Sequence, residues 1–120
     1  MHQPDFNQHG FLRVAAATPV VSIADPAANA EAILKQLQDL AEQQVAVAVF
    51  PELGLSSYSA EDLFFSENLL SDCRQALALL ARHSPLPFCA IGTPWRLADG
   101  RLLNCAALLG NGRVLGMVPK

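Results

Sequence analysis

A run of six apolar residues with no polar interruption, VAVAVF at positions 45–50, constrains the fold of this chain more than any other feature. A run of this length and texture is typical of a buried strand. A similar run, FLRVAAAT at positions 11–18, is apolar apart from Arg13. We expect it to form a strand covered on both faces. The two runs predict an α/β protein, which some schemes would class as α+β.

The segment between these runs has the pattern of an amphipathic helix. Asp25 suits the N-cap, where its side chain can accept a backbone hydrogen bond, and Pro26 suits the first helical position. Apolar residues then recur at intervals of three and four and form one buried stripe. They are Ala30, Ile33, Leu34, Leu37, Leu40 and Ala41. Strand, helix and strand in this order form a βαβ unit with parallel strands.

A second helix and a third strand continue the alternation. Ser66 can cap a helix that closes before Pro85 and Pro87, and FCAIG at positions 88–92 has the texture of a strand. The stripe that this helix buries consists of Leu69, Leu70, Cys73, Ala76, Leu77 and Leu80. The sequence therefore predicts two crossover helices and three parallel strands.

The tail has a different texture. Two tight-turn pairs, Asp99-Gly100 and Asn111-Gly112, bracket RLLNCAALL (101–109), and RVLGMV (113–118) follows the second pair. The last three strands therefore form a meander, which makes the sheet mixed. Two hairpins reverse the chain twice, so the strand at 113–118 should run the same way as the strand at 45–50.

These directions bring an acid and a base to one edge of the sheet. Glu52 follows the strand at 45–50, and Lys120 follows the strand at 113–118. In open α/β sheets the carboxyl ends of the strands are where sites are built. A carboxylate placed there costs free energy through desolvation, unless it is paired with a positive charge or has a catalytic role. From the residues alone, a structural ion pair or two unrelated strand ends remain alternatives to a catalytic site.

Composition excludes several classes of function. The formal charge is −3 and the pI is near 5.4, with no basic run, which argues against a nucleic-acid partner. No apolar stretch approaches the roughly 20 residues that cross a bilayer, and the amino terminus has no signal-peptide pattern. Cys73, Cys89 and Cys105 lack metal-type spacing and predict reduced, buried thiols of a cytoplasmic protein. Charged residues make up only 16%, which suggests that much of the surface meets other protein.

Three stretches carry a resemblance to a known family. VFPELGLSSYSAEDL (49–63) resembles the segment around the catalytic glutamate of the nitrilase superfamily, and GRVLGMVPK (112–120) resembles its strand leading to the catalytic lysine. The opening FLRVAAATPVVSIADPAANAEAIL (11–34) follows the same layout. Within the superfamily, this opening and the Tyr-Ser-x-Glu-Asp-Leu stretch look most like the glutaminase domain of glutamine-dependent NAD synthetases.

The resemblance implies a fold and a domain layout. The fold would be a four-layer αββα sandwich, of which residues 11–120 form the N-terminal part behind a flexible arm at 1–10. The rest of that domain and a synthetase domain would lie outside this chain. One face of the present sheet should then be uncovered, unless another chain or copy packs there.

The resemblance also implies a Glu-Lys-Cys mechanism. Glu52 would be the general base and Lys120 the charge near the oxyanion, while Tyr58 would line the glutamine pocket. Tyr58 could equally be a loop residue with its hydroxyl in water. The ammonia released from glutamine would serve the amidation of nicotinic acid adenine dinucleotide to NAD. ATP and magnesium would belong to the synthetase domain, with no cofactor in this chain, and the full-length enzyme would be a homo-oligomer.

The sequence departs from the family in one respect. The family nucleophile follows the lysine, and Cys73, Cys89 and Cys105 all precede Lys120. We therefore expect an incomplete chain without glutaminase activity of its own. Two other functions stay open: a stand-alone nitrilase-type hydrolase of another small amide, and a non-catalytic interaction module with a degenerate nitrilase fold.

Overall fold

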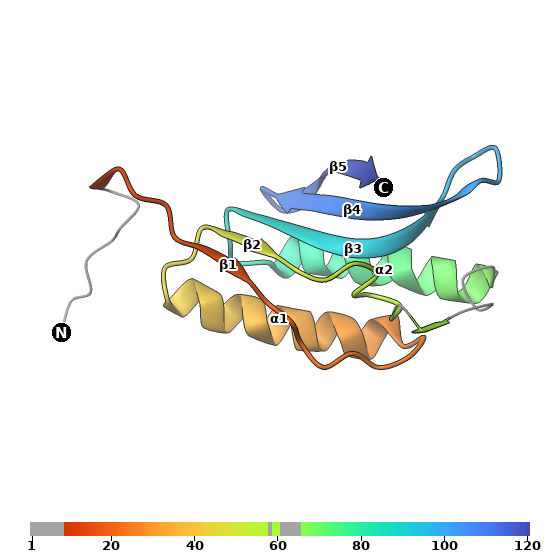
Figure 1. Cartoon of the computed structure of the whole chain (residues 1–120), viewed down its shortest axis with the longest axis horizontal. Helices are drawn as coiled ribbons and strands as arrows, with labels where there is room; N and C mark the ends of the chain where they lie inside the picture. Colours follow the sequence, from red (N-terminus) through yellow and green to blue (C-terminus); the bar gives the residue numbers. More distant parts are fainter. Residues whose placement is uncertain (1–8, 58, 61–65) are drawn as a thin grey trace.

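In the part of the chain that the structure describes, one mixed five-stranded sheet packs against two α-helices. The computed structural model describes residues 9–57, 59–60 and 66–120. Its elements are β1 (Val14–Ala16), α1 (Pro26–Glu42), β2 (Val47–Val49), α2 (Glu67–His83), β3 (Phe88–Arg96), β4 (Leu102–Gly110) and β5 (Arg113–Pro119). The strand order is β1-β2-β3-β4-β5, with β1, β2 and β3 parallel and β3, β4 and β5 antiparallel (Figure 1). This arrangement confirms the predicted α/β class, strand directions and meander.

Both helices begin at the predicted caps. Oδ1 of Asp25 accepts a hydrogen bond from the backbone nitrogen of Ala28 at 3.1 Å. Oγ of Ser66 accepts one from Leu69 at 3.4 Å. Each cap satisfies a backbone donor that the first helical turn would otherwise leave unpaired, which is typically worth about 1 kcal/mol.

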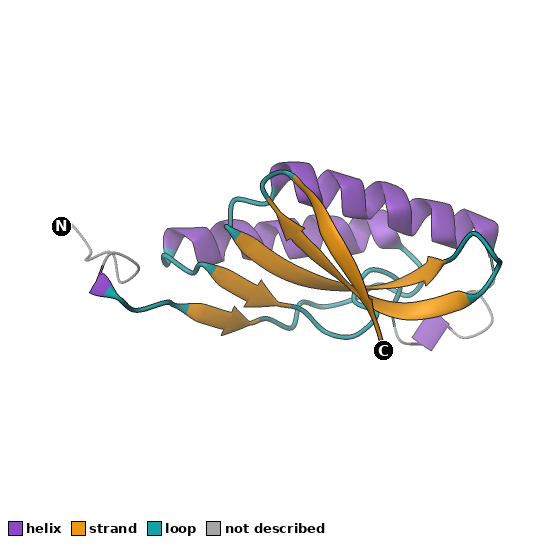
Figure 2. Cartoon of the chain, turned by 90° about the horizontal axis from the view of Figure 1, so that it is seen from above, coloured by secondary structure: helices purple, strands orange, loops and turns teal. Residues whose placement is uncertain are grey.

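The two helices pack on the same face of the sheet (Figures 1 and 2). The crossovers β1-α1-β2 and β2-α2-β3 step in the same direction across the sheet, and crossovers of one hand place both helices on one side. Their apolar stripes meet the side chains that the strands direct toward them. This core includes Ile33, Leu37, Leu77, Leu80, Ala48, Cys89, Ile91, Ala107 and Leu109.

The opposite face of the sheet carries apolar side chains that no layer of the described residues covers. We call it the open face and define it by Val14, Val49, Ala90, Ala106 and Val118, which the strand register places on one side. Val14, Val49 and Val118 are 63%, 50% and 51% exposed. The expectation of an uncovered sheet face is confirmed.

The expectation that the run at 11–18 forms a strand covered on both faces is wrong for the chain as it stands. Only Val14–Ala16 is a strand, it lies at the sheet edge, and Phe11 and Leu12 are exposed. An apolar run indicates that both faces of its strand are suited to burial. The helices that the structure describes cover only one of these faces. The predicted arm at 1–10 falls largely on residues 1–8, outside the described residues.

The meander is longer than the sequence indicates, and its β4–β5 pairing has a register shift between Leu108 and Leu109. β3 continues to Arg96 because β4 pairs with it from Cys89–Leu109 to Arg96–Leu102. The turn into β5 has positive φ at Asn111 (54°) and Gly112 (76°), as two-residue hairpin turns require. Among the helices that the structure describes, none combines the length and hydropathy needed to cross a membrane.

Candidate active site

Glu52 lies in a tight turn directly after β2, and Gly92 on β3 allows that turn to approach the sheet. A Cβ added at Gly92 would lie 2.4 Å from the backbone oxygen of Pro51 and 2.4 Å from the backbone nitrogen of Leu53. No real side chain tolerates such contacts, so only glycine fits here. The turn is fixed to the same residue by the backbone nitrogen of Leu55, which donates to the oxygen of Gly92 at 3.1 Å.

The far end of the turn is held by Asn29, a buried polar residue on α1. Its Nδ2 donates to the oxygen of Leu55 and to the oxygen of Ser22, both at 2.8 Å, and its Oδ1 accepts from the nitrogen of Ser22 at 2.7 Å. Asn29 is only 2% exposed, so these bonds supply the partners that its buried amide needs. The turn that carries Glu52 is therefore tied to both the sheet and the helix layer.

Lys120 reaches the same place from β5. The β4–β5 register pairs Cys105 with Pro119, which puts the next residues, Asn104 and Lys120, opposite each other. The backbone nitrogen of Lys120 donates to the oxygen of Asn104 at 2.8 Å. Strand alternation directs the side chains of Asn104 and Lys120 toward the open face.

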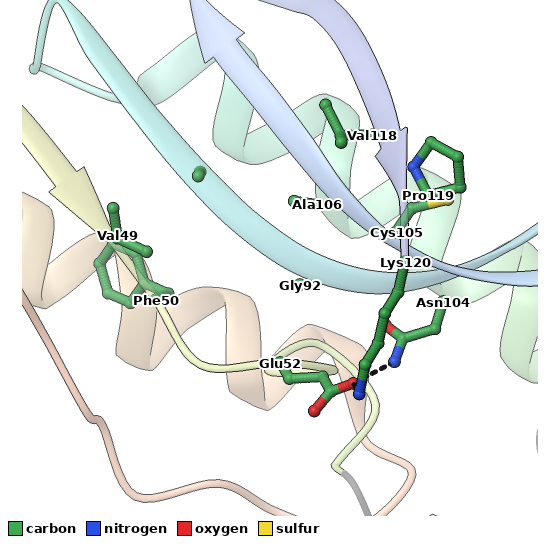
Figure 3. A pocket seen from close by; sticks show the side chains of 11 residues that line it. Val49, Phe50, Glu52, Gly92, Asn104, Cys105, Ala106, Val118, Pro119 and Lys120 are labelled. Carbon is green, nitrogen blue, oxygen red and sulfur yellow. Dashed lines mark hydrogen bonds and ion pairs between the residues drawn. The ribbon is translucent and has the colours of Figure 1, made fainter.

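The two charged side chains meet. Nζ of Lys120 lies 2.8 Å from Oε1 of Glu52, and Nδ2 of Asn104 donates to the same oxygen (Figure 3). The hydrogen bond from Lys120, followed by that from Asn104, lowers the pKa of Glu52 below its usual value, so Glu52 is a carboxylate at neutral pH. The prediction that Glu52 and Lys120 share one edge of the sheet is confirmed.

This ion pair is open to solvent. The side chains of Lys120 and Glu52 are 74% and 39% exposed. Exposed pairs of this kind contribute little to stability. The pair therefore adds little to the stability of the fold. It borders a pocket, which suggests a functional role instead.

The pocket has a volume of about 340 Å³ and lies on the open face beside the pair (Figure 3). One end is polar and the floor is apolar. Its lining includes Glu52, Asn104 and Lys120 at the polar end and Val49, Ala90, Ala106 and Val118 along the floor. A carboxylate and an ammonium group at one end of an apolar depression can transfer a proton and stabilise a developing negative charge.

The three cysteines do not complete this site. Cys73, Cys89 and Cys105 are buried and unpaired, as predicted. Burial raises the pKa of all three thiols, that of Cys73 to about 11, which favours the protonated form at neutral pH. Cys105 borders the pocket, but strand alternation turns its side chain toward the helices, away from Asn104 and Lys120.

Tyr58, the third residue that the resemblance singles out, lies outside the described residues. In the described part of the chain, no three His, Cys, Asp or Glu side chains come together as a metal site would require.

Sequence reasoning missed three residues that shape the site: Asn104, Gly92 and Asn29. Asn104 is the only polar residue within the apolar run LLNCAALL at 102–109, and that interruption was a signal that could have found it. Gly92 and Asn29 carry no comparable signal, because their roles depend on contacts with a turn far away in the sequence.

Comparison with known proteins gives the chain its family. The carbon-nitrogen hydrolase family matches residues 13–118. The glutamine-dependent NAD(+) synthetase of Mycobacterium tuberculosis (strain H37Rv) is 44% identical over 115 residues, and that of Aquifex aeolicus is 34% identical over 101 residues. These alignments cover 94% and 82% of this chain but 17% of each relative, so the chain spans about a sixth of their length.

Solved structures agree on the fold. A glutamine-dependent NAD(+) synthetase from Cytophaga hutchinsonii superposes with a TM-score of 0.85 at 27% identity, over 91% of this chain and 19% of that one. An amidase from Nesterenkonia sp. AN1 gives a TM-score of 0.76 at 21% identity, over 92% of this chain and 44% of that one, a likeness of fold alone. The fold is thus that of nitrilase-superfamily domains, and the chain belongs to the carbon-nitrogen hydrolase family.

Proposed function

We propose that this chain carries the general base and the oxyanion-stabilising lysine of the glutamine-hydrolysing site of a glutamine-dependent NAD synthetase. The observation that carries the proposal is the 2.8 Å contact between Oε1 of Glu52 and Nζ of Lys120 beside a pocket. These residues are 68 positions apart in the sequence, and two separate strands deliver them to one edge. The similarity to NAD synthetases over 94% of the chain supports the choice of substrate.

In this proposal Glu52 takes the proton from a cysteine thiol that is none of the three in this chain. The thiolate attacks the side-chain amide carbon of glutamine, and Lys120 stabilises the negative oxygen that results. Glu52 returns the proton to the departing nitrogen, which leaves as ammonia. Water then cleaves the thioester to give glutamate and restore the thiol. Glu52 can accept a proton in the first step because its pKa, lowered by the hydrogen bonds from Lys120 and Asn104, leaves it unprotonated at neutral pH.

The wider assignments belong to the same proposal. The ammonia would amidate nicotinic acid adenine dinucleotide in a synthetase domain outside this chain, which would hold the ATP and magnesium. The chain alone would hydrolyse no glutamine, because its thiols are buried with raised pKa values. We also propose that Tyr58 lines the glutamine pocket, and that the full enzyme is a cytoplasmic homo-oligomer.

The test replaces Glu52 and Lys120 in the full-length enzyme. We expect Glu52→Gln, which preserves size, to lower glutamine-driven NAD synthesis by roughly 10²–10⁴-fold. Lys120→Ala should lower it similarly. Synthesis driven by an ammonium salt should stay near the wild-type rate in both variants, because ammonium bypasses the amide-cleaving site.

Each alternative has its own result. Near-normal glutamine hydrolysis by Glu52→Gln would contradict the general-base role. A wild-type protein that hydrolyses another small amide but makes no NAD from either nitrogen source would be a stand-alone hydrolase. A wild-type protein without any hydrolase activity would fit an interaction module.

A further inference from the structure

We propose that Asn104 is a positioning residue of this site, which fixes the orientation of the Glu52 carboxylate and its distance from Lys120. Its catalytic consequence rests on the proposed function, whereas its action on the carboxylate can be tested without any activity. Three observations carry the inference: where β4 places Asn104, which groups it uses, and which carboxylate oxygen it contacts.

The first observation is the location of Asn104 between the two partners. β4 is flanked by β3, over which the Glu52 turn passes, and by β5, which leads to Lys120. The register sets Asn104 opposite Pro94 on one side and opposite Lys120 on the other. A side chain at this position can therefore bridge the turn and the end of β5, and Asn104 contacts both Glu52 and Lys120.

The second observation is that Asn104 uses different groups for each partner. Its side-chain amide donates to Glu52, and its backbone oxygen accepts from the backbone nitrogen of Lys120 at 2.8 Å. The backbone bond belongs to the sheet and would survive any substitution except proline. The side-chain bond is not part of the ladder, so replacing the side chain removes that contact and leaves the strand pairing in place.

The third observation is that both donors reach the same oxygen of the carboxylate. Nδ2 of Asn104 and Nζ of Lys120 converge on Oε1 of Glu52, and Figure 3 shows the other oxygen turned away from both. Two bonds at one oxygen fix the rotation of the carboxylate. Oε2 is then the oxygen presented to an acidic proton, and Asn104 selects it.

The first experiment measures the ionisation of Glu52 in the full-length protein without relying on catalysis. A water-soluble carbodiimide with glycinamide modifies protonated carboxyl groups, and mass spectrometry of the Glu52 peptide gives its extent at each pH. Asn104→Leu keeps the size but removes a donor that lowers the pKa of Glu52. We expect Glu52 in the Asn104→Leu variant to remain open to modification at higher pH than Glu52 in the wild type.

A matched control makes the same chemical change elsewhere. Asn68→Leu replaces an exposed asparagine in the first turn of α2 and should leave the modification profile of Glu52 unchanged. Should Asn104→Leu fail to fold, Asn104→Asp retains shape and polarity. It replaces the donor with a second carboxylate, and we expect a larger displacement in the same direction.

The second experiment is kinetic. Asn104→Leu should lower kcat for glutamine hydrolysis by roughly tenfold to a hundredfold, because a misplaced base loses alignment. KM should change by less than about twofold, because the side-chain amide of Asn104 donates its hydrogen bond to Glu52 rather than to substrate. The acid limb of kcat/KM should move to higher pH, since the base now gains its proton more readily.

The outcomes separate the two proposals. An unchanged modification profile in Asn104→Leu overturns the positioning role. A raised KM with unchanged kcat also overturns it, because Asn104 would then contact substrate. If the wild type hydrolyses no glutamine, the proposed function fails, and a displaced modification profile still supports the action of Asn104 on Glu52.

Discussion

The two faces of the sheet carry similar apolar side chains but have opposite surroundings. Cys89, Ala107 and Leu109 point toward the helices and are at most 1% exposed. Val49 and Val118 point to the open face and are about half exposed. The site lies on the open side, where Glu52 and Lys120 meet. The face that the helices cover therefore provides stability, while the open face carries the candidate site and a surface suited to further burial.

Two leucine substitutions on one strand test most directly whether the two faces differ in their contribution to stability. Leu109 and Leu108 are adjacent on β4 and point to opposite faces, with Leu109 1% exposed and Leu108 partly exposed. We expect Leu109→Ala to lower the free energy of unfolding by about 2–5 kcal/mol, because it leaves a cavity. Leu108→Ala should cost about 1 kcal/mol or less. Denaturant unfolding measures both, and equal losses would refute the distinction.

The reactivity of thiols on the two faces tests the same difference in burial. Cys73, Cys89 and Cys105 lie in the layer between sheet and helices, and burial raises the pKa of Cys73 to about 11. A cysteine introduced by Val14→Cys would lie on the open face at an exposed position. We expect it to react with a maleimide at least about a hundredfold faster than Cys73 at neutral pH, since thiolate is the reactive form. Comparable labelling of Cys73 would show that the helix layer opens readily.

The smallest effect is expected at the junction of the two faces. Gly92→Ala would force a Cβ to within 2.4 Å of Pro51 and Leu53, so the Glu52 turn must move, at a cost of about 1–3 kcal/mol. Under the proposed function, glutamine hydrolysis by the full-length variant should fall as well. Gly116→Ala is the matched control, because nothing lies within 4 Å of its added Cβ. Equal stability losses in the two variants, by denaturant unfolding, would mean that close approach is not what Gly92 provides.

Local sequence determined most of the secondary structure and half of the site. Asp25 and Ser66 start the helices, and Asn111 and Gly112 supply the left-handed turn into β5, because capping and turn geometry depend only on neighbouring residues. Counting crossovers and hairpins was enough to bring Glu52 and Lys120 to one edge. Strand direction follows from connectivity, so this part of the site could be predicted without coordinates.

Only the tertiary structure decided what covers each face and what holds Glu52 in place. The apolar run at 11–18 looks the same in sequence whether its strand is central or, as here, at an edge. The contact between Asn104 and Glu52 spans 52 positions, and that between Gly92 and the turn spans about 40. Contacts of this kind depend on how separate elements approach one another in space, and the spacing of residues along the chain does not encode that approach.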